Sequence, residues 1–186
     1  MRKLNLVIAL VLFGMSANAQ DVKFPTLDAS PADIAYFPLN ATHAKKGDAS
    51  VPLIKVVYSR PALKGRVAFG ELEAFGKVWR LGANENTEIR FFKPANISGK
   101  TIPAGTYSLF AIPQKDNWVI IINKQADRWG AYSYDETKDL LRVTVPVKPL
   151  ATAVEALAIT FSPVENGAKL IIGWDKTSVE VPFAIK

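Results

Sequence analysis

The sequence lacks cysteine altogether, and it contains a single histidine, His43. Without cysteine there can be no disulfide, no thiol nucleophile, no iron–sulfur ligation and no cysteine zinc site. One histidine cannot build a multi-histidine metal site, and any Ser–His–Asp triad would depend on His43 alone. That residue lies in a polar stretch beside Lys45 and Lys46, and no Gly-x-Ser-x-Gly motif accompanies it, so we interpret it as a surface side chain. The acidic residues form no dense calcium-binding loop, and we expect neither a bound metal nor a cofactor.

Long apolar runs are also absent, except at the N-terminus. Two basic residues precede an apolar stretch over residues 6–15, and residues 17–19 have the small-x-small pattern of a cleavage site. The apolar stretch is too short to span a bilayer, and no later run approaches the roughly 20 apolar residues that a membrane helix needs. We therefore predict a signal peptide over residues 1–19, cleaved between Ala19 and Gln20. The mature protein is expected to be periplasmic or secreted, with no membrane span.

A strong excess of one charge sign is missing as well. The chain has 23 Lys and Arg against 17 Asp and Glu, and its formal net charge of +6 loses two units when Arg2 and Lys3 leave with the leader. The remaining basic residues are scattered, and no basic stripe with interleaved aromatic residues is present. We therefore expect no nucleic-acid partner.

Residues 20–52 differ from the rest of the chain, because they are rich in proline and polar residues and show no strand alternation. We predict an irregular segment with one short helix. Ser30 would cap that helix, Pro31 suits its first position, Asp33 lies where a capping-box acid would stand, and Pro38 would end it.

From residue 53 to residue 186, apolar residues recur at every second position. Ile54, Val56 and Tyr58 begin the pattern, which recurs near residues 87–92, 141–148 and 157–161. Residues 118–122 are apolar on both faces, as in a central strand.

Turn-forming residues separate these segments. Asn166-Gly167 is the strongest turn signal, and Asp175-Lys176 is expected to join the last two strands as a closing hairpin. Only residues 70–75 and 135–139 have the pattern of brief helices. We predict an all-β fold, a single-domain antiparallel β-sandwich or barrel-like fold over residues 53–186 with one or two short helices.

The densest group of chemically useful residues lies between two predicted strands, where Arg80 is followed by Asn84 and Glu85. Arg80 can offer a bidentate fork to a carboxylate or phosphate, and Asn84 can donate and accept hydrogen bonds. Arg60 could help to hold a charged ligand beside them. The alternative is structural, with Arg80 paired to Glu85 so that the loop is tied down.

Aromatic residues form a second candidate group. Trp118 lies in the two-faced apolar segment and is expected in the core, whereas Trp129 and Tyr132 flank Gly130 in a predicted loop and are better placed to stack on a sugar. Paired acids could in principle serve a glycosidase, although surface acids are the usual case; the neighbouring pairs are Glu71 and Glu73, Glu85 and Glu88, and Asp135 and Glu136.

Several ordered motifs resemble one bacterial family. They are Tyr58-Ser59-Arg60-Pro61, Gly65-Arg66, Phe69-Gly70, Val78-Trp79-Arg80-x-Gly82-Ala83-Asn84-Glu85, Ala104-Gly105-Thr106-Tyr107-Ser108-Leu109-Phe110-x-Ile112-Pro113 and Trp129-Gly130-Ala131-Tyr132-Ser133-Tyr134. Over about residues 53–183 the chain resembles the family named domain of unknown function 2911. The resemblance implies an exported or periplasmic protein, often from Bacteroidetes, with a mainly β domain. It implies no particular activity.

Together these patterns favour a non-enzymatic binding module. Its ligand-binding residues would be Arg60, Arg80, Asn84, Glu85, Trp129 and Tyr132, and its partner a small polar or anionic ligand, a carbohydrate or an envelope protein. The alternative is a hydrolase acting on envelope sugars or peptides, with Glu85 as general acid or base and Arg80 holding the substrate. In a third, purely structural interpretation, the same motifs only close the sandwich.

The leader gives the first testable prediction. When the full chain is expressed in a bacterium with a secretory pathway, the intact mass of the product should correspond to a chain that begins at Gln20. Replacing Ala19 with Asp should block processing, because signal peptidase needs a small residue there. An unprocessed wild-type chain in the cytoplasm would contradict the prediction.

Overall fold

The computed structural model describes residues 21–42, 45–46 and 51–185. The predicted leader and His43 lie outside these residues. Within the described part of the chain, no helix is long and apolar enough to cross a membrane.

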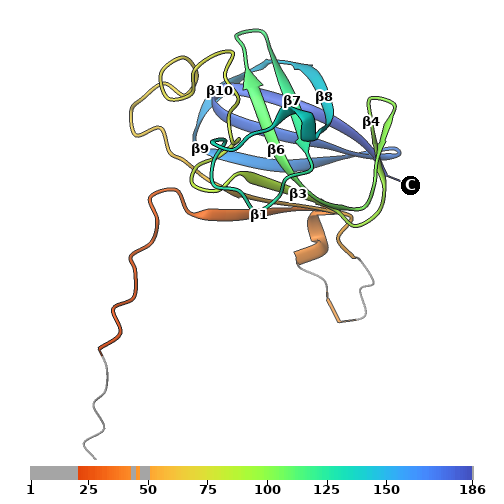
Figure 1. Ribbon diagram of the computed structural model, residues 1–186, viewed down its shortest axis with the longest axis horizontal. Coiled ribbons are helices and arrows are strands. Elements are labelled where there is room, and N and C mark those ends of the chain that lie inside the picture. The colour runs from red at the N-terminus through yellow and green to blue at the C-terminus, as the bar shows by residue number, and fades with distance from the viewer. Residues whose placement is uncertain (1–20, 43–44, 47–50, 186) are drawn as a thin grey trace, which may run out of the picture.

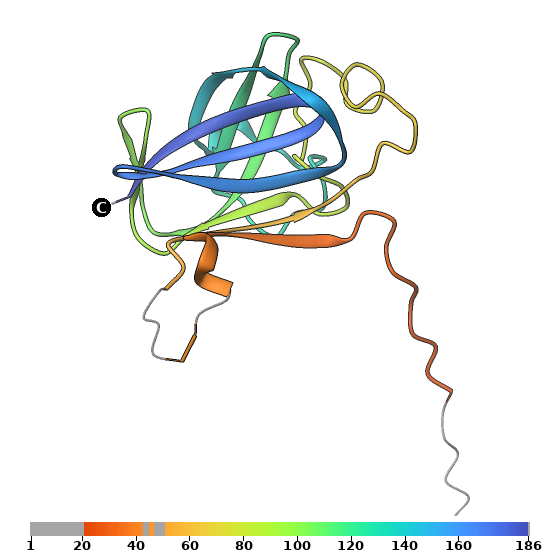
Figure 2. The same ribbon diagram turned by 180° about the vertical axis from the view of Figure 1, so that it is seen from behind.

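Six strands form the larger sheet, in the spatial order β1-β2-β3-β6-β7-β8, and every neighbouring pair is antiparallel. Their bounds are β1 Ala32–Phe37, β2 Ile54–Ser59, β3 Thr87–Phe91, β6 Gly105–Pro113, β7 Asn117–Asn123 and β8 Asp139–Pro146. A second sheet has the order β5-β4-β10-β9, with β4 Ala95–Ile97, β5 Lys100–Ile102, β9 Lys148–Val164 and β10 Gly167–Ile185. The long β9–β10 hairpin lies across the larger sheet (Figures 1 and 2). The predicted all-β sandwich is confirmed, and the two sheets do not close into a barrel.

The core lies between the two sheets, as the period-two pattern requires. Ile54 and Val56 point inward from β2 and are fully buried, and Leu170 and Ile172 do the same from β10. Phe91 of β3 meets Phe183 of β10 edge to face, with ring centroids 5.7 Å apart, so the sheets interdigitate.

One end of the sandwich is filled by a cluster of four aromatic side chains. Trp79 stacks on Trp174 at 5.8 Å, while Phe69 packs edge to face against both rings and against Trp118. All three tryptophans are buried, which confirms the prediction that Trp118 belongs to the core.

The predicted N-terminal helix is wrong, because residues 32–37 form strand β1. This strand pairs with β2 from Ala32 opposite Ser59 to Phe37 opposite Ile54. The local capping signals around Ser30 were outweighed by a ladder to residues far along the chain, which a local pattern cannot reveal. The short helix of this region is instead the 3₁₀ helix η1, Leu39–Thr42. The division between residues 52 and 53 stays a prediction.

The remaining local expectations have mixed outcomes. Residues 135–139 contain the 3₁₀ helix η2, Glu136–Lys138, as expected, whereas residues 70–75 form turns rather than a helix. The closing hairpin at Asp175-Lys176 is also wrong, because β10 continues through it as one strand. Its register against β9 shifts on both sides of Asp175, whose φ is +55°. The turn-forming residues therefore produce an irregularity in the strand pairing and do not reverse the chain.

The segment between β7 and β8, residues 124–138, lies over the outer face of the six-stranded sheet (Figure 1). We call it the strap. Its Tyr134 packs edge to face on Phe110, which points outward from β6, with ring centroids 5.2 Å apart. Because this outer face is covered by a loop of the same chain, the strap creates hollows between itself and the neighbouring strands.

Candidate functional site

The predicted binding residues do not form one site. Four of them line two hollows that the loop 82–86 separates: Arg80 and Asn84 line one, and Glu85 and Trp129 line the other. Arg60 and Tyr132 line neither hollow, and the two hollows share no lining residue. We call the larger one the outer groove and the smaller one the arginine cavity.

The outer groove lies beside the strap, on the outer face of β2 and β3, and has a volume of about 540 Å³. Its floor and walls come from β1, β2, the loop 82–86, β3 and the strap: Ala32, Val57, Tyr58, Ser59, Glu85, Asn86, Glu88, Asp127, Arg128 and Trp129. Val57 alternates with the inward-pointing Val56 and Tyr58, so the pleat of β2 itself places an apolar side chain on the groove floor.

Trp129 forms one wall of the outer groove, and 60% of its surface is exposed. An antiparallel bridge to Glu85 fixes its backbone. Three carboxylates, Glu85, Glu88 and Asp127, share the groove with the single cation Arg128. The groove therefore combines an exposed aromatic ring with a surplus of hydrogen-bond acceptors and negative charge.

Asn86 joins the loop 82–86 to the strap. Its backbone N–H donates to the Arg128 carbonyl at 3.0 Å, and its side-chain oxygen accepts from the Arg128 N–H at 2.8 Å. Its side-chain amide donates to the Ser108 hydroxyl of β6 at 2.7 Å. Next to it, the Glu88 carboxylate accepts from the Asp127 N–H at 2.7 Å. Asn86 is buried, and its bond to Ser108 is shielded from water, whereas the bond between Glu88 and Asp127 is exposed; together these bonds hold the groove wall in one place.

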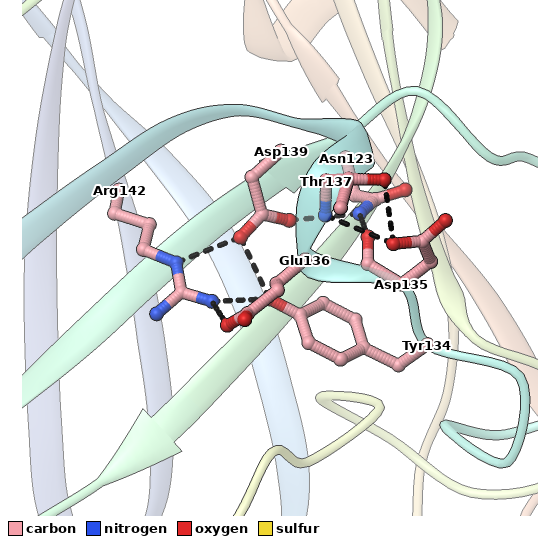
Figure 3. A network of polar contacts seen from close by, with 7 residues as sticks. All are labelled: Asn123, Tyr134, Asp135, Glu136, Thr137, Asp139 and Arg142. Carbon is pink, nitrogen blue, oxygen red and sulfur yellow. Dashed lines mark hydrogen bonds and ion pairs between the residues drawn. The ribbon is translucent and has the colours of Figure 1, made fainter.

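A polar network anchors the other end of the strap on β7 and β8 (Figure 3). The Tyr134 hydroxyl donates to Asp139 Oδ2 at 2.7 Å, and Arg142 donates to the same oxygen at 2.7 Å and to the Tyr134 oxygen at 2.6 Å. Asn123 donates to Asp139 Oδ1 at 2.7 Å and to the Asp135 carbonyl at 2.9 Å. Burial and the Asp139 carboxylate together raise the pKa of Tyr134 to about 12, so the phenol remains a donor at physiological pH.

The arginine cavity lies on the other side of the loop 82–86 and has a volume of about 270 Å³. Its walls are Pro61, Arg66, Leu72, Glu73, Arg80, Gly82, Ala83, Asn84 and Trp174. Arg80 Nη1 donates to the Asn84 carbonyl at 2.8 Å. Arg66 donates from Nε to the Leu63 carbonyl at 2.8 Å and from Nη2 to the Ala62 carbonyl at 3.0 Å. Backbone carbonyls thus hold both guanidinium groups in place.

The strap also contacts Arg80. The guanidinium carbon lies 5.5 Å from the centre of the Tyr132 ring, a cation–π distance. Gly130 has a φ of +64°, and a Cβ there would lie 3.0 Å from Arg80 Nη1, so glycine is needed where the guanidinium passes the backbone. Trp129 thus faces the outer groove, while Gly130 and Tyr132 support the arginine cavity.

Glu73 is half-buried in the arginine cavity. Burial raises the pKa of its carboxyl to about 7, although the positive charge of Arg80 and the indole of Trp79 act in the opposite direction. A carboxyl with this pKa changes charge at physiological pH. Its local sequence gave no reason to prefer it over Glu71, because only the long-range approach of Arg80 and Trp174 makes its environment distinctive.

Two predicted contacts are absent from the described residues. Arg80 and Glu85 form no ion pair there and border different hollows, so the structural pairing of these two side chains is wrong. Arg60 lines neither hollow; it donates to Asp33 at 2.9 Å and to the Leu157 carbonyl at 2.9 Å, and so ties β2 to β1 and β9.

Asn84 has a φ of +58°, which asparagine tolerates better than most residues, and its side-chain amide donates to Asp28 at 3.0 Å. No group of three or more His, Cys, Asp or Glu side chains in the described part of the chain could hold a metal ion.

Comparison with known proteins identifies a family but no relative of known activity. A family model described as "Protein of unknown function (DUF2911)" matches residues 40–183. No curated protein and no solved structure matches the chain.

The raised pKa of Glu73 predicts how stability changes with pH. The folded protein keeps the carboxyl neutral up to a pH of about 7, whereas the unfolded chain ionises it near the usual glutamate pKa of 4.5. The contribution of the neutral Glu73 carboxyl to the stability of the folded protein is complete below the unfolded pKa of 4.5. It is lost as the pH rises through the folded pKa of about 7. Because Glu73 is partly solvated, we expect a loss of about 1–2 kcal/mol relative to Glu73→Gln between pH 4.5 and 7.5.

Chemical denaturation of both proteins across this range measures the difference. All other titrating groups are common to the two chains, so their contributions cancel in the comparison. Unfolding free energies that run parallel over the whole range would show that Glu73 ionises normally in the folded protein.

Proposed function

The chain belongs to the DUF2911 family, and we propose that it is a binding module whose outer groove takes a neutral or positively charged polyhydroxyl ligand, that is, a sugar or an amino sugar. The observation that carries the proposal is the exposed ring of Trp129 beside three carboxylates in one hollow of about 540 Å³. Hollows of this size suit small ligands.

The aromatic wall supports the sugar part of the proposal. An exposed tryptophan ring loses apolar surface when the C–H face of a sugar stacks on it, and it keeps a preferred geometry for that contact. The 60% exposure of Trp129 means that most of its ring is available. The antiparallel bridge to Glu85 and the bonds of Asn86 hold the wall in place before a ligand arrives, which lowers the entropic cost of binding.

The charges of the outer groove support the proposal that the ligand is neutral or positively charged. Glu85, Glu88 and Asp127 can accept hydrogen bonds from hydroxyl groups, and together they outnumber Arg128. An anionic ligand would be repelled, whereas an ammonium group would be attracted both to the carboxylates and to the face of Trp129. Of the two ligand chemistries that the sequence suggested, the outer groove therefore favours the polar one over the anionic one.

The hydrolase alternative requires Glu85 and Arg80 to act on one substrate. The two side chains line separate hollows, so a molecule confined to one hollow would contact only one of them. We therefore prefer binding to catalysis.

We further propose that the protein meets its ligand in the periplasm or outside the cell. The predicted signal peptide over residues 1–19 supports this location.

Three sugars with the same ring test the proposal: D-glucosamine, D-glucose and D-glucuronate, which carry a positive, a neutral and a negative group. Calorimetric titration of the mature protein at pH 6 should give the tightest binding for glucosamine and the weakest for glucuronate. Trp129→Ala should weaken glucosamine binding roughly tenfold, or about 1.4 kcal/mol, because the stacking surface is lost.

Phe92→Ala is the matched control, since Phe92 is a partly exposed ring that lines neither hollow. It should leave all three affinities unchanged. The proposal fails if none of the three sugars binds, if glucuronate binds most tightly through Trp129, or if Trp129→Ala binds glucosamine as well as the wild type does.

A further inference from the structure

The arginine cavity has a different chemistry from the outer groove. Where the groove has three carboxylates and one arginine, this cavity has two arginines, Arg66 and Arg80, and the single carboxyl of Glu73. Because the two hollows share no lining residue, a ligand of the arginine cavity would contact none of the residues that line the groove.

Both guanidinium groups are held in place by hydrogen bonds that occupy only some of their N–H donors. An arginine has five N–H donors. Backbone carbonyls accept from one nitrogen of Arg80 and from two nitrogens of Arg66. Neither side chain forms an ion pair among the described residues, so each keeps donors and a full charge for a ligand. Fixed guanidinium groups with free donors are suited to carboxylate recognition.

Apolar side chains share the lining of the cavity with the two arginines. They are Leu72, Pro61, Ala83 and Trp174 of β10, of which only 1% of the surface is exposed. Apolar contacts beside two guanidinium groups fit a ligand with a short hydrocarbon part and one negative group. The volume of about 270 Å³ gives room for a small molecule.

We propose that the arginine cavity binds the carboxylate of a small organic acid between Arg66 and Arg80, and that Glu73 makes this binding depend on pH. When Glu73 is neutral, the cavity carries two positive charges, and the carboxyl can donate its O–H to the bound carboxylate. When Glu73 is ionised, its charge repels the ligand and competes for the arginines.

The charges around Glu73 are consistent with this role. Arg80 faces it from the segment that precedes the loop 82–86, and Arg66 lines the same cavity from the loop that follows β2. Two further carboxylates lie on neighbouring segments, but backbone N–H groups engage both: Glu71 accepts from Val67 at 3.2 Å, and Asp175 of β10 accepts from Ala68 at 3.3 Å. The raised pKa of Glu73, about 7, sets the pH range in which affinity should change.

Butyrate and butyramide are the test pair, because they have the same shape and differ in charge. Titrations of the ¹⁵N-labelled mature protein, followed by NMR, should show butyrate shifting the amides of residues 80–84 while butyramide does not. With a Glu73 pKa of about 7, the dissociation constant for butyrate should be roughly tenfold larger at pH 8 than at pH 6.

Variants separate the contributions of the side chains. Glu73→Gln should bind butyrate equally at both pH values, because a neutral amide replaces the titrating group, and Arg80→Gln should abolish binding at both. Arg90→Gln is the matched control: Arg90 is exposed on β3, where its guanidinium lies over Phe92, and it lines neither hollow.

Three results would overturn the proposal. The first is a response to butyramide as strong as that to butyrate, which needs no variant and shows that charge is not recognised. The second is wild-type affinity that does not change between pH 6 and pH 8. The third is a pH dependence that persists in Glu73→Gln, which would assign the titration to another group.

Discussion

The buried side chain of Asn86 is the contact on which both hollows depend. Asn86 exchanges two hydrogen bonds with the backbone of Arg128 and donates a third to Ser108 of β6. These bonds fix the strap to the loop 82–86. As a result, Trp129 stands over the outer groove and Tyr132 lies beside Arg80. Further anchors of the strap are the bridge of Trp129 to Glu85, the bond from the Asp127 N–H to Glu88 and, at the far end of the segment, the Tyr134 network (Figure 3).

One loop thereby separates two environments of opposite charge. The residues from Gly82 to Asn84 face the arginine cavity, and Glu85 and Asn86 face the outer groove. The backbone turns at Asn84, whose φ is +58°, between the residues that line the cavity and those that line the groove, so a short polar motif can serve two sites at once. This arrangement resolves the ambiguity of the motif, which combined an arginine suited to anions with a glutamate suited to hydroxyl groups or cations.

Sequence reasoning reached the fold class and the exposure of Trp129 and Tyr132, because period-two alternation and loop glycines report local burial directly. It placed Arg80 and Glu85 in one site because they are close along the chain. It could not single out Asn86, or prefer Glu73 to Glu71: the first owes its importance to a partner more than 40 residues away, and the second to its burial in the folded chain. Strand β1 was missed for the same reason, since its partner β2 lies across a long loop.

The central claim is that Asn86 holds the strap in the position that forms the outer groove. Hydrogen exchange at the Arg128 amide tests it most directly, because that N–H donates to the Asn86 side-chain oxygen. In Asn86→Ala, exchange at Arg128 should become faster by roughly tenfold or more, whereas the amide of Ile121 in the middle of β7 should keep its protection. An Arg128 amide that stays as protected as in the wild type would contradict the account.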